Sequence, residues 1–206
     1  MKTENQEARR REIEDAAYEV LANKGYKATS MLAIAKRASA SNETLYKWYG
    51  NKQTLFRSLV EENARAVQGM IQKSLAGEAD PLEAIRGLGP VLLRLVTGPK
   101  AVTLNRAVVG DVHETGTLRK TLAQAGKGAV APQIALLFLK AQDQGLMNFD
   151  EPEDVAEIYL NLLIGDLQIL RVTGVREALE ETEIARRAAR AFDLICRLYG
   201  PDKLSA

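Results

Sequence analysis

The side chains whose types suggest a chemical role are concentrated between residues 24 and 57. This segment holds seven basic residues and one acidic residue, Glu43, so its formal charge is 7 − 1 = +6, whereas the complete chain of 206 residues carries only +1. The basic residues are Lys24, Lys27, Lys36, Arg37, Lys47, Lys52 and Arg57. A local excess of positive charge in a nearly neutral chain is typical of a surface that binds phosphates. The segment therefore indicates a nucleic-acid-binding site.

Three side chains near the start of a predicted helix are suited to reading bases. Asn42, Glu43 and Lys47 lie on its exposed side. Asn can pair with adenine, Lys with guanine, and Glu can accept a hydrogen bond from the cytosine amino group. Trp48, the single tryptophan, follows in the same helix. Its indole either contacts the DNA backbone or supports the helix from behind.

Lys52 lies in the first turn of the next predicted helix, where the helix dipole disfavours a cation. An external phosphate that approaches the same backbone amides would explain this lysine better than internal stability does. The alternative is a lysine that is simply solvated.

Short helices must position these side chains. The first is expected to begin at Ser30, whose hydroxyl can accept a hydrogen bond from the free amides of the first turn. Leu32, Ala35 and Ala38 recur at helical spacing and form one apolar stripe. The helix is expected to end near Ala38.

A second short helix follows after a brief turn. Ser41 is its expected cap, and Leu45 and Tyr49, four residues apart, form its inward face. Asn51 is expected to cap a third helix. The apolar residues of the third helix are Leu55, Phe56 and Leu59. Two short helices joined by such a turn form a helix-turn-helix, whose second helix can enter the major groove of DNA.

The run ATSMLAIAKRASASNETLYKWYGNKQTLF, which begins at Ala28, resembles the DNA-binding signature of the TetR (tetracycline-repressor) family of bacterial transcriptional regulators, in its AcrR-like form. The matching features are the Thr/Ser helix start, Leu32-Ala33, Ile34-Ala35, the Ser41 cap, Thr44-Leu45-Tyr46, Trp48-Tyr49, Asn51-Lys52 and Leu55-Phe56. One departure is Ser39, which takes the turn position where the family usually has a glycine in a left-handed conformation.

The resemblance implies further roles. Ser30, Thr44, Tyr46 and Lys52 match positions that in the family commonly hold the DNA backbone, and their hydroxyls and ammonium suit phosphate oxygens. The implied partner is a double-stranded DNA operator. In the family, the long helix that begins near Lys52 connects the DNA-binding head to the body, so that a shift at its far end can change the separation of two heads.

The remainder of the chain is expected to be helical, because Gly and Pro punctuate apolar patterns of helical period and no strand-like alternation occurs. One helix is expected from Pro152 to about Thr173, and the segment from Leu118 to Gln144 is expected to divide or kink near Gly126. The predicted fold is all-α. It has an N-terminal three-helix helix-turn-helix DNA-binding head over residues 1–57 and a C-terminal helical bundle for ligand binding and dimerisation over residues 58–206.

The last two long predicted helices have more apolar surface than a helix can bury against a single neighbour. The stretch AEIYLNLLIGDLQILRV is apolar around most of its circumference, and the final helix has two adjoining apolar stripes. One stripe can face the core and the other a second subunit, as in a four-helix bundle across a twofold axis. The residues assigned to the interface of this predicted homodimer are Leu162, Ile169, Ile184, Ala188, Ala191 and Ile195.

A ligand site in the body is indicated by polar residues among apolar ones. Asp166 interrupts an apolar run, and Asn105, Asp111 and the lone His113 lie on or near another core helix. Buried polar groups need partners, and either a ligand or a protein neighbour can supply them. The mainly apolar body predicts a small hydrophobic or amphipathic effector.

The composition argues against an enzyme and a membrane protein. With one histidine and one cysteine, His113 and Cys196, the chain has little material for a zinc cluster or a nucleophilic site, and neither a cofactor nor a metal is expected. No pair of carboxylates is singled out for acid–base catalysis. No apolar run of about 18 residues and no signal-peptide pattern is seen, so a cytoplasmic protein without a membrane partner is expected.

The sequence thus predicts a ligand-responsive, dimeric transcriptional regulator, which as a repressor would bind a palindromic operator and be released by its effector. A helical ligand-binding or adaptor protein without specific DNA binding is the alternative. Duplex binding that weakens steeply with salt distinguishes the two.

Overall fold

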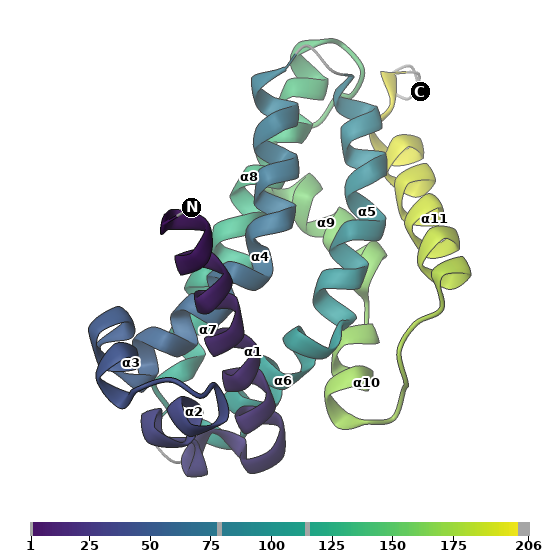
Figure 1. Ribbon diagram of the computed structural model, residues 1–206. Coiled ribbons are helices and arrows are strands. Elements are labelled where there is room, and N and C mark those ends of the chain that lie inside the picture. The colour runs from purple at the N-terminus through teal and green to yellow at the C-terminus, as the bar shows by residue number, and fades with distance from the viewer. Residues whose placement is uncertain (1, 78–79, 114–115, 202–206) are drawn as a thin grey trace. The chain divides into compact units, whose positions relative to one another are not determined.

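The computed structural model describes residues 2–77, 80–113 and 116–201. Every regular element in these ranges is an α-helix (Figure 1), which confirms the predicted all-α class. In chain order the helices are α1 (Lys2–Ala28), α2 (Met31–Arg37), α3 (Asn42–Tyr49), α4 (Lys52–Ala76), α5 (Pro81–Thr97), α6 (Pro99–Asp111), α7 (Leu118–Ala125), α8 (Lys127–Asp143), α9 (Pro152–Ile164), α10 (Leu167–Thr173) and α11 (Glu181–Tyr199).

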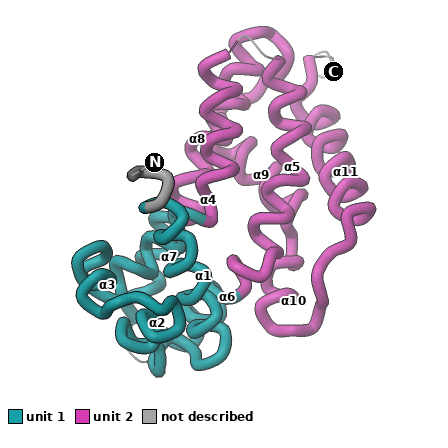
Figure 2. The backbone as a smooth tube through the Cα atoms, viewed as in Figure 1, with its two compact units in different colours: residues 1–62, 103–125 teal, residues 63–102, 126–206 magenta. Residues whose placement is uncertain are grey.

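The helices form two compact units (Figure 2). Unit 1 comprises residues 1–62 and 103–125, and unit 2 comprises residues 63–102 and 126–206. Both divisions fall inside helices, since α4 and α6 each begin in one unit and end in the other.

Unit 1 is built around an apolar cluster to which all of its helices contribute. Leu45 and Phe56 are at most 1% exposed, and burying such a side chain contributes about 1.5–3 kcal/mol. The buried hydroxyl of Tyr18 donates a hydrogen bond to the carbonyl of Leu59 at 2.9 Å, which ties α1 to α4. The ring of Tyr26 lies edge-to-face on Phe56, with 5.9 Å between the centroids.

The segment 103–125 completes this cluster through Leu104, Ala107 and Leu118, which are all buried. The compact unit therefore differs from the head predicted over residues 1–57, because it includes the end of α6 and all of α7. The apolar period of these helices is visible in the sequence. The period does not say against which neighbour the apolar stripe packs.

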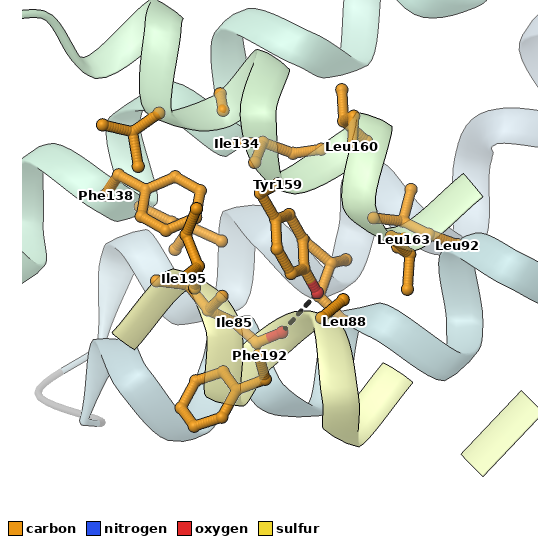
Figure 3. Close-up of a cluster of buried hydrophobic side chains, with 14 of the residues drawn as sticks. Ile85, Leu88, Leu92, Ile134, Phe138, Tyr159, Leu160, Leu163, Phe192 and Ile195 are labelled. Atoms are coloured by element: carbon orange, nitrogen blue, oxygen red, sulfur yellow. Dashed lines mark hydrogen bonds between the residues drawn. The ribbon is translucent and has the colours of Figure 1, made fainter. Parts of the chain in front are cut away.

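The core of unit 2 surrounds Tyr159 of α9 (Figure 3). Its hydroxyl donates a hydrogen bond to the carbonyl of Ile85 in α5 at 3.1 Å, and its ring lies edge-to-face on Phe138 with 5.6 Å between centroids. A Cβ atom on Gly89 would lie only 3.0 Å from both the Tyr159 hydroxyl and the Cβ of Ala188. A glycine at position 89 thus allows α9 and α11 to approach α5 closely.

The single helix predicted from Pro152 to Thr173 is wrong, because Gly165 separates α9 from α10. Gly165 has φ 51° and ψ −129°, a conformation that is available essentially to glycine alone. Arg187 of α11 donates to the carbonyls of Leu163 at 2.6 Å and Ile164 at 3.1 Å. Its guanidinium therefore satisfies carbonyls at the end of α9 that have no helical partner.

The predicted interface stripe of α11 is corrected by the structure. Ile184, Ala188, Ala191 and Ile195 are at most 3% exposed and belong to the apolar core of unit 2, where α11 packs on α5 and α9. A side chain buried in its own chain cannot also contact a second subunit. Leu162 is half-buried and Ile169 is 56% exposed, so these two remain accessible.

The stretch Leu118–Asp143, which spans α7 and α8, is long and apolar enough to cross a membrane by length and composition alone. This differs from the expectation that no apolar stretch reaches that length. The signal is weak evidence for a membrane span, because core helices of soluble proteins give it too. Here Ile134, Leu137 and Phe138 belong to the core of unit 2.

Candidate nucleic-acid interface

The predicted caps of the short helices are confirmed. The Ser30 hydroxyl accepts a hydrogen bond from the amide of Ala33 at 3.1 Å, and the Ser41 hydroxyl accepts one from the amide of Thr44 at 2.9 Å. The side chain of Asn51 accepts one from the amide of Thr54 at 2.8 Å, so it caps α4. These bonds fix where α2, α3 and α4 begin, at about 1 kcal/mol for a typical cap.

The buried face of α2 is rotated from the predicted stripe, so that Leu32 is not part of it. Leu32 is 51% exposed, whereas Met31 and Ile34 are buried together with Ala35 and Ala38. Over seven residues, the apolar positions of α2 fit two neighbouring stripes almost equally well. The packing partners in α1 and α3 decide between them.

The turn between α2 and α3 places Ser39 at φ 49°, the only non-glycine residue with positive φ among those the structure describes. The amides of Ser39 and Ala40 donate back to the carbonyls of Lys36 and Ala35, at 3.3 and 2.9 Å. This pair of bonds is a Schellman motif, which requires a left-handed residue at that position. Serine thus adopts the conformation for which glycine is the usual residue, at a cost of about 1–2 kcal/mol.

The guanidinium of Arg9 in α1 donates a hydrogen bond to the carbonyl of Ser39 at 2.7 Å and pairs with Glu12. Arg10 lies 5.6 Å from the ring centroid of Tyr49 and 3.4 Å from the carboxylate of Glu14. The basic run Arg9–Arg11 within α1 therefore includes two arginines that brace α3 and its preceding turn. The sequence indicates Glu12 and Glu14 as acids that balance these arginines, but not the contacts with Ser39 and Tyr49.

The exposed side of α3 carries the residues predicted to read bases. Asn42, Glu43 and Lys47 are exposed, whereas Leu45 and Tyr49 are buried, as predicted for the inward face. Among the residues predicted to hold the backbone, Ser30 and Tyr46 are exposed, and Thr44 and Lys52 are half-buried. Trp48 is half-buried and packs against the apolar cluster of unit 1, as a supporting side chain would.

The basic character predicted for this segment is present at the surface of unit 1. All of its basic residues except the half-buried Lys52 are exposed. Arg37 forms an ion pair with Glu19 of α1, which neutralises part of that charge. Lys24, Lys36, Lys47 and Arg57 add exposed positive charge that attracts phosphates.

Lys52 has partners inside unit 1 that the sequence did not indicate. Its ammonium donates a hydrogen bond to the carbonyl of Tyr26 at 3.0 Å and lies 4.0 Å from the centroid of the Tyr26 ring. Burial lowers the pKa of Lys52, and the nearby carboxylate of Asp111 opposes that shift. Lys52 is therefore held at the start of α4 and is not simply solvated.

The residues predicted to bind a ligand are divided between the two units. Asn105, Asp111 and His113 belong to unit 1, and Asp166 belongs to unit 2. His113 and Asp166 are exposed, and Asp166 does not interrupt a continuous helix because it follows the break at Gly165. Asn105 is half-buried. Asp111 is buried, and its carboxylate accepts a hydrogen bond from the amide of Leu118 at 3.1 Å, so a protein neighbour satisfies it.

Comparisons with known proteins agree with this arrangement. Residues 13–59 match the sequence profile described as bacterial regulatory proteins, tetR family, and residues 83–201 match the C-terminal domain of AefR-like transcriptional repressors. Among curated proteins, the HTH-type transcriptional regulator UidR of Escherichia coli K12 is 25% identical over 203 residues, which cover 97% of this chain and 95% of UidR.

Solved structures share the fold over nearly the whole chain. A TetR-family transcriptional regulator from Mesorhizobium loti MAFF303099 is 24% identical, with a TM-score of 0.77 over 94% of this chain and 97% of the other. The flavonoid-responsive regulator FrrA is 25% identical, with a TM-score of 0.69 over 95% of this chain and 98% of FrrA.

Proposed function

We propose that this chain, which belongs to the TetR family of bacterial transcriptional regulators, is a repressor that occupies a palindromic DNA operator as a homodimer. The family and the named relatives are transcriptional regulators and not enzymes. Repression would follow from occupying a promoter. Such a protein would act in the cytoplasm, where the DNA is.

The observation that carries the proposal is the division of α3 into two faces. Its buried residues fix the helix to unit 1, and Asn42, Glu43 and Lys47 point their polar groups to solvent from its first two turns. The N-terminal part of a recognition helix is the part that reaches base edges in the major groove. Ser30, Thr44, Tyr46 and Lys52 would hold the flanking phosphates and so fix the register of the helix.

Dimer formation is supported by the exposed surface of unit 2. Ile169 and Val175 are 56% and 75% exposed, which is large for apolar side chains close together in sequence and fits an interface. The exposed residues of α9 include three acids, and those of α11 include three arginines and two acids, Asp193 and Glu181, the second of which pairs with Arg94. These residues are Glu153, Asp154 and Glu157 on α9, and Arg186, Arg190 and Arg197 on α11.

A twofold pairing that sets α9 of one subunit beside α11 of the other would bring these opposite charges together. We assign Leu162, Ile169 and Val175 to this interface in place of the buried stripe of α11. Two heads related by the dyad would then read a palindrome, with half-sites about one helical turn or a multiple apart.

Release by a small hydrophobic or amphipathic molecule completes the proposal. FrrA is named as responsive to flavonoids, which are aromatic and amphipathic, and the body of this chain has an apolar core with a buried hydroxyl at Tyr159. An effector that binds unit 2 more tightly in one arrangement of the dimer would shift the population away from the arrangement that fits DNA. The shift is limited by the difference between its two affinities.

The decisive experiment is selection of bound sequences from a random duplex library with the purified protein, at two salt concentrations. The expected result is a palindromic motif whose recovery falls at the higher salt. The matched control is Asn42→Ala, which should change the motif without abolishing binding. Failure to bind any duplex at either salt would refute the regulator proposal and leave a helical ligand-binding or adaptor protein.

A further inference from the structure

We infer that Tyr26 and Asp111 are positioning residues, which hold the ammonium of Lys52 where a DNA phosphate can meet it. The inference rests on the proposed function, and adds two buried residues from outside the helix-turn-helix that support its DNA-binding surface. Both lie in unit 1, one near the end of α1 and the other at the last position of α6.

Tyr26 holds Lys52 with two different groups. Its carbonyl accepts a hydrogen bond from the ammonium at 3.0 Å, and its ring face lies 4.0 Å from the same nitrogen. The ring is itself fixed, since Tyr26 is 8% exposed and packs edge-to-face on Phe56. An ammonium has three donors, so two remain for a phosphate when one is used by the carbonyl.

Asp111 adds a buried negative charge that acts on Lys52. Its side chain is 2% exposed, and its carboxylate accepts a hydrogen bond from the amide of Leu118. This bond fixes the carboxylate at the end of α6, next to the start of α7. Burial lowers the pKa of Lys52, and the negative charge of Asp111 opposes that shift. Asp111 thus attracts the Lys52 ammonium, the group that binds phosphate.

The consequence for DNA binding is preorganisation. A free lysine side chain loses rotamer freedom when it binds a phosphate, and this opposes binding. Lys52 is already ordered by the carbonyl and ring of Tyr26, so less freedom is lost at the moment of binding. Removing the Tyr26 ring or the Asp111 charge should therefore weaken the phosphate contact even though neither residue touches DNA.

The test measures duplex affinity for Asp111→Asn and Tyr26→Leu, each in the wild type and in a Lys52→Ala background. Asn retains an oxygen for the Leu118 amide and removes the charge, while Leu removes the ring and leaves the backbone carbonyl. Each change should raise the Kd about three- to ten-fold in the wild type, the size expected for ordering one long side chain. In the Lys52→Ala background the same changes should have no further effect.

The control is Asp143→Asn, which removes an exposed carboxylate of unit 2 and should leave the affinity unchanged. Equal losses in both backgrounds would show that the residues act on folding alone, and tighter binding by Asp111→Asn would show that Asp111 competes with phosphate. Either result overturns the inference. Thermal unfolding identifies a variant that fails to fold. The affinity of the other variant then tests the inference.

The proposed function and the positioning role of Tyr26 and Asp111 can be refuted separately. If the wild type binds no duplex, the proposed function falls, and the role of Lys52 towards phosphate falls with it. If the wild type binds a palindrome and the Asp111→Asn and Tyr26→Leu proteins bind it equally well, only the positioning inference is wrong.

Discussion

The hydroxyl of Tyr159 and the carbonyl of Ile85 are joined by a 3.1 Å hydrogen bond in the middle of an otherwise apolar core. The hydroxyl is fully buried, and burial raises the pKa of Tyr159 well above its ordinary value, so the phenol stays protonated and donates. The bond links α9 to α5 near the position where Gly89 lets these helices approach. A polar contact in such a place sets the alignment of the two helices more than it adds stability.

Tyr159→Phe should lower the free energy of unfolding by about 1 kcal/mol, because the hydrogen bond is lost while the ring and its contacts remain. Urea unfolding followed by circular dichroism measures this. Tyr46→Phe is the matched control, since Tyr46 is 50% exposed, and its stability should be unchanged. A loss of the same size in both variants would contradict a specific role for the buried bond.

Gly165→Ala should destabilise the protein by about 1–3 kcal/mol, the cost of an unfavourable backbone conformation. The new Cβ would also lie 2.6 Å from the Arg187 guanidinium, which caps α9. Gly69→Ala in α4 is the control, because its Cβ would meet nothing within 4 Å, and it should stabilise the helix by about 0.5–1 kcal/mol. Thermal unfolding of both proteins shows whether each change raises or lowers stability. A Gly165→Ala protein of unchanged stability would be inconsistent with the left-handed turn.

Ser39→Gly should stabilise unit 1 by about 1 kcal/mol, because glycine adopts the left-handed conformation of Ser39 without the steric cost. Ser39→Ala keeps the Cβ and therefore the strain, so it serves as the control. Urea titration of the two variants should give a higher midpoint only for glycine. Equal midpoints would mean that Ser39 is not strained.

Lys52→Ala should weaken binding to all duplexes by a similar factor and reduce the slope of log K against log salt by about 0.9, the value for one phosphate contact. Lys47→Ala should instead change the preferred sequence. Lys127→Ala, at an exposed position in unit 2, is the charge-matched control. The affinities of each variant for the selected motif and for scrambled duplexes distinguish the two roles. Identical effects of Lys47→Ala and Lys52→Ala would contradict this division of roles.

Ile169→Glu should shift the proposed homodimer towards monomer at micromolar concentration, because it places a charge in an apolar contact. Leu136→Glu, at a position that is 49% exposed on α8, controls for the added charge and should leave the assembly unchanged. Size-exclusion chromatography with light scattering measures the mass. A dimer that tolerates Ile169→Glu and is lost in Leu136→Glu would place the interface on α8.

Local signals in the sequence predicted local structure well. The caps at Ser30, Ser41 and Asn51 depend on residues three positions away, and all three form as predicted. The left-handed turn at Ser39 followed from its place in the family signature, and its φ of 49° agrees.

Predictions that depended on distant partners were less successful. The stripe of Ile184, Ala188, Ala191 and Ile195 was correctly seen as apolar, but the sequence could not say whether α5 or a second subunit covers it. For the same reason Asp111, 59 positions after Lys52, gave no sign that its charge acts on that lysine. Helical periodicity shows which face of a helix is apolar, but not which helix or subunit packs against that face.

The return of residues 103–125 to unit 1 has a consequence during synthesis. A ribosome releases the chain from its N-terminus, so the helix-turn-helix emerges while Leu104, Ala107 and Leu118, which complete its core, are still to be made. The DNA-binding unit therefore cannot finish folding before more than half of the chain has been translated. A nascent chain interrupted before that point would expose the apolar surface that these residues cover, and would be a substrate for chaperones or proteases instead of a truncated repressor.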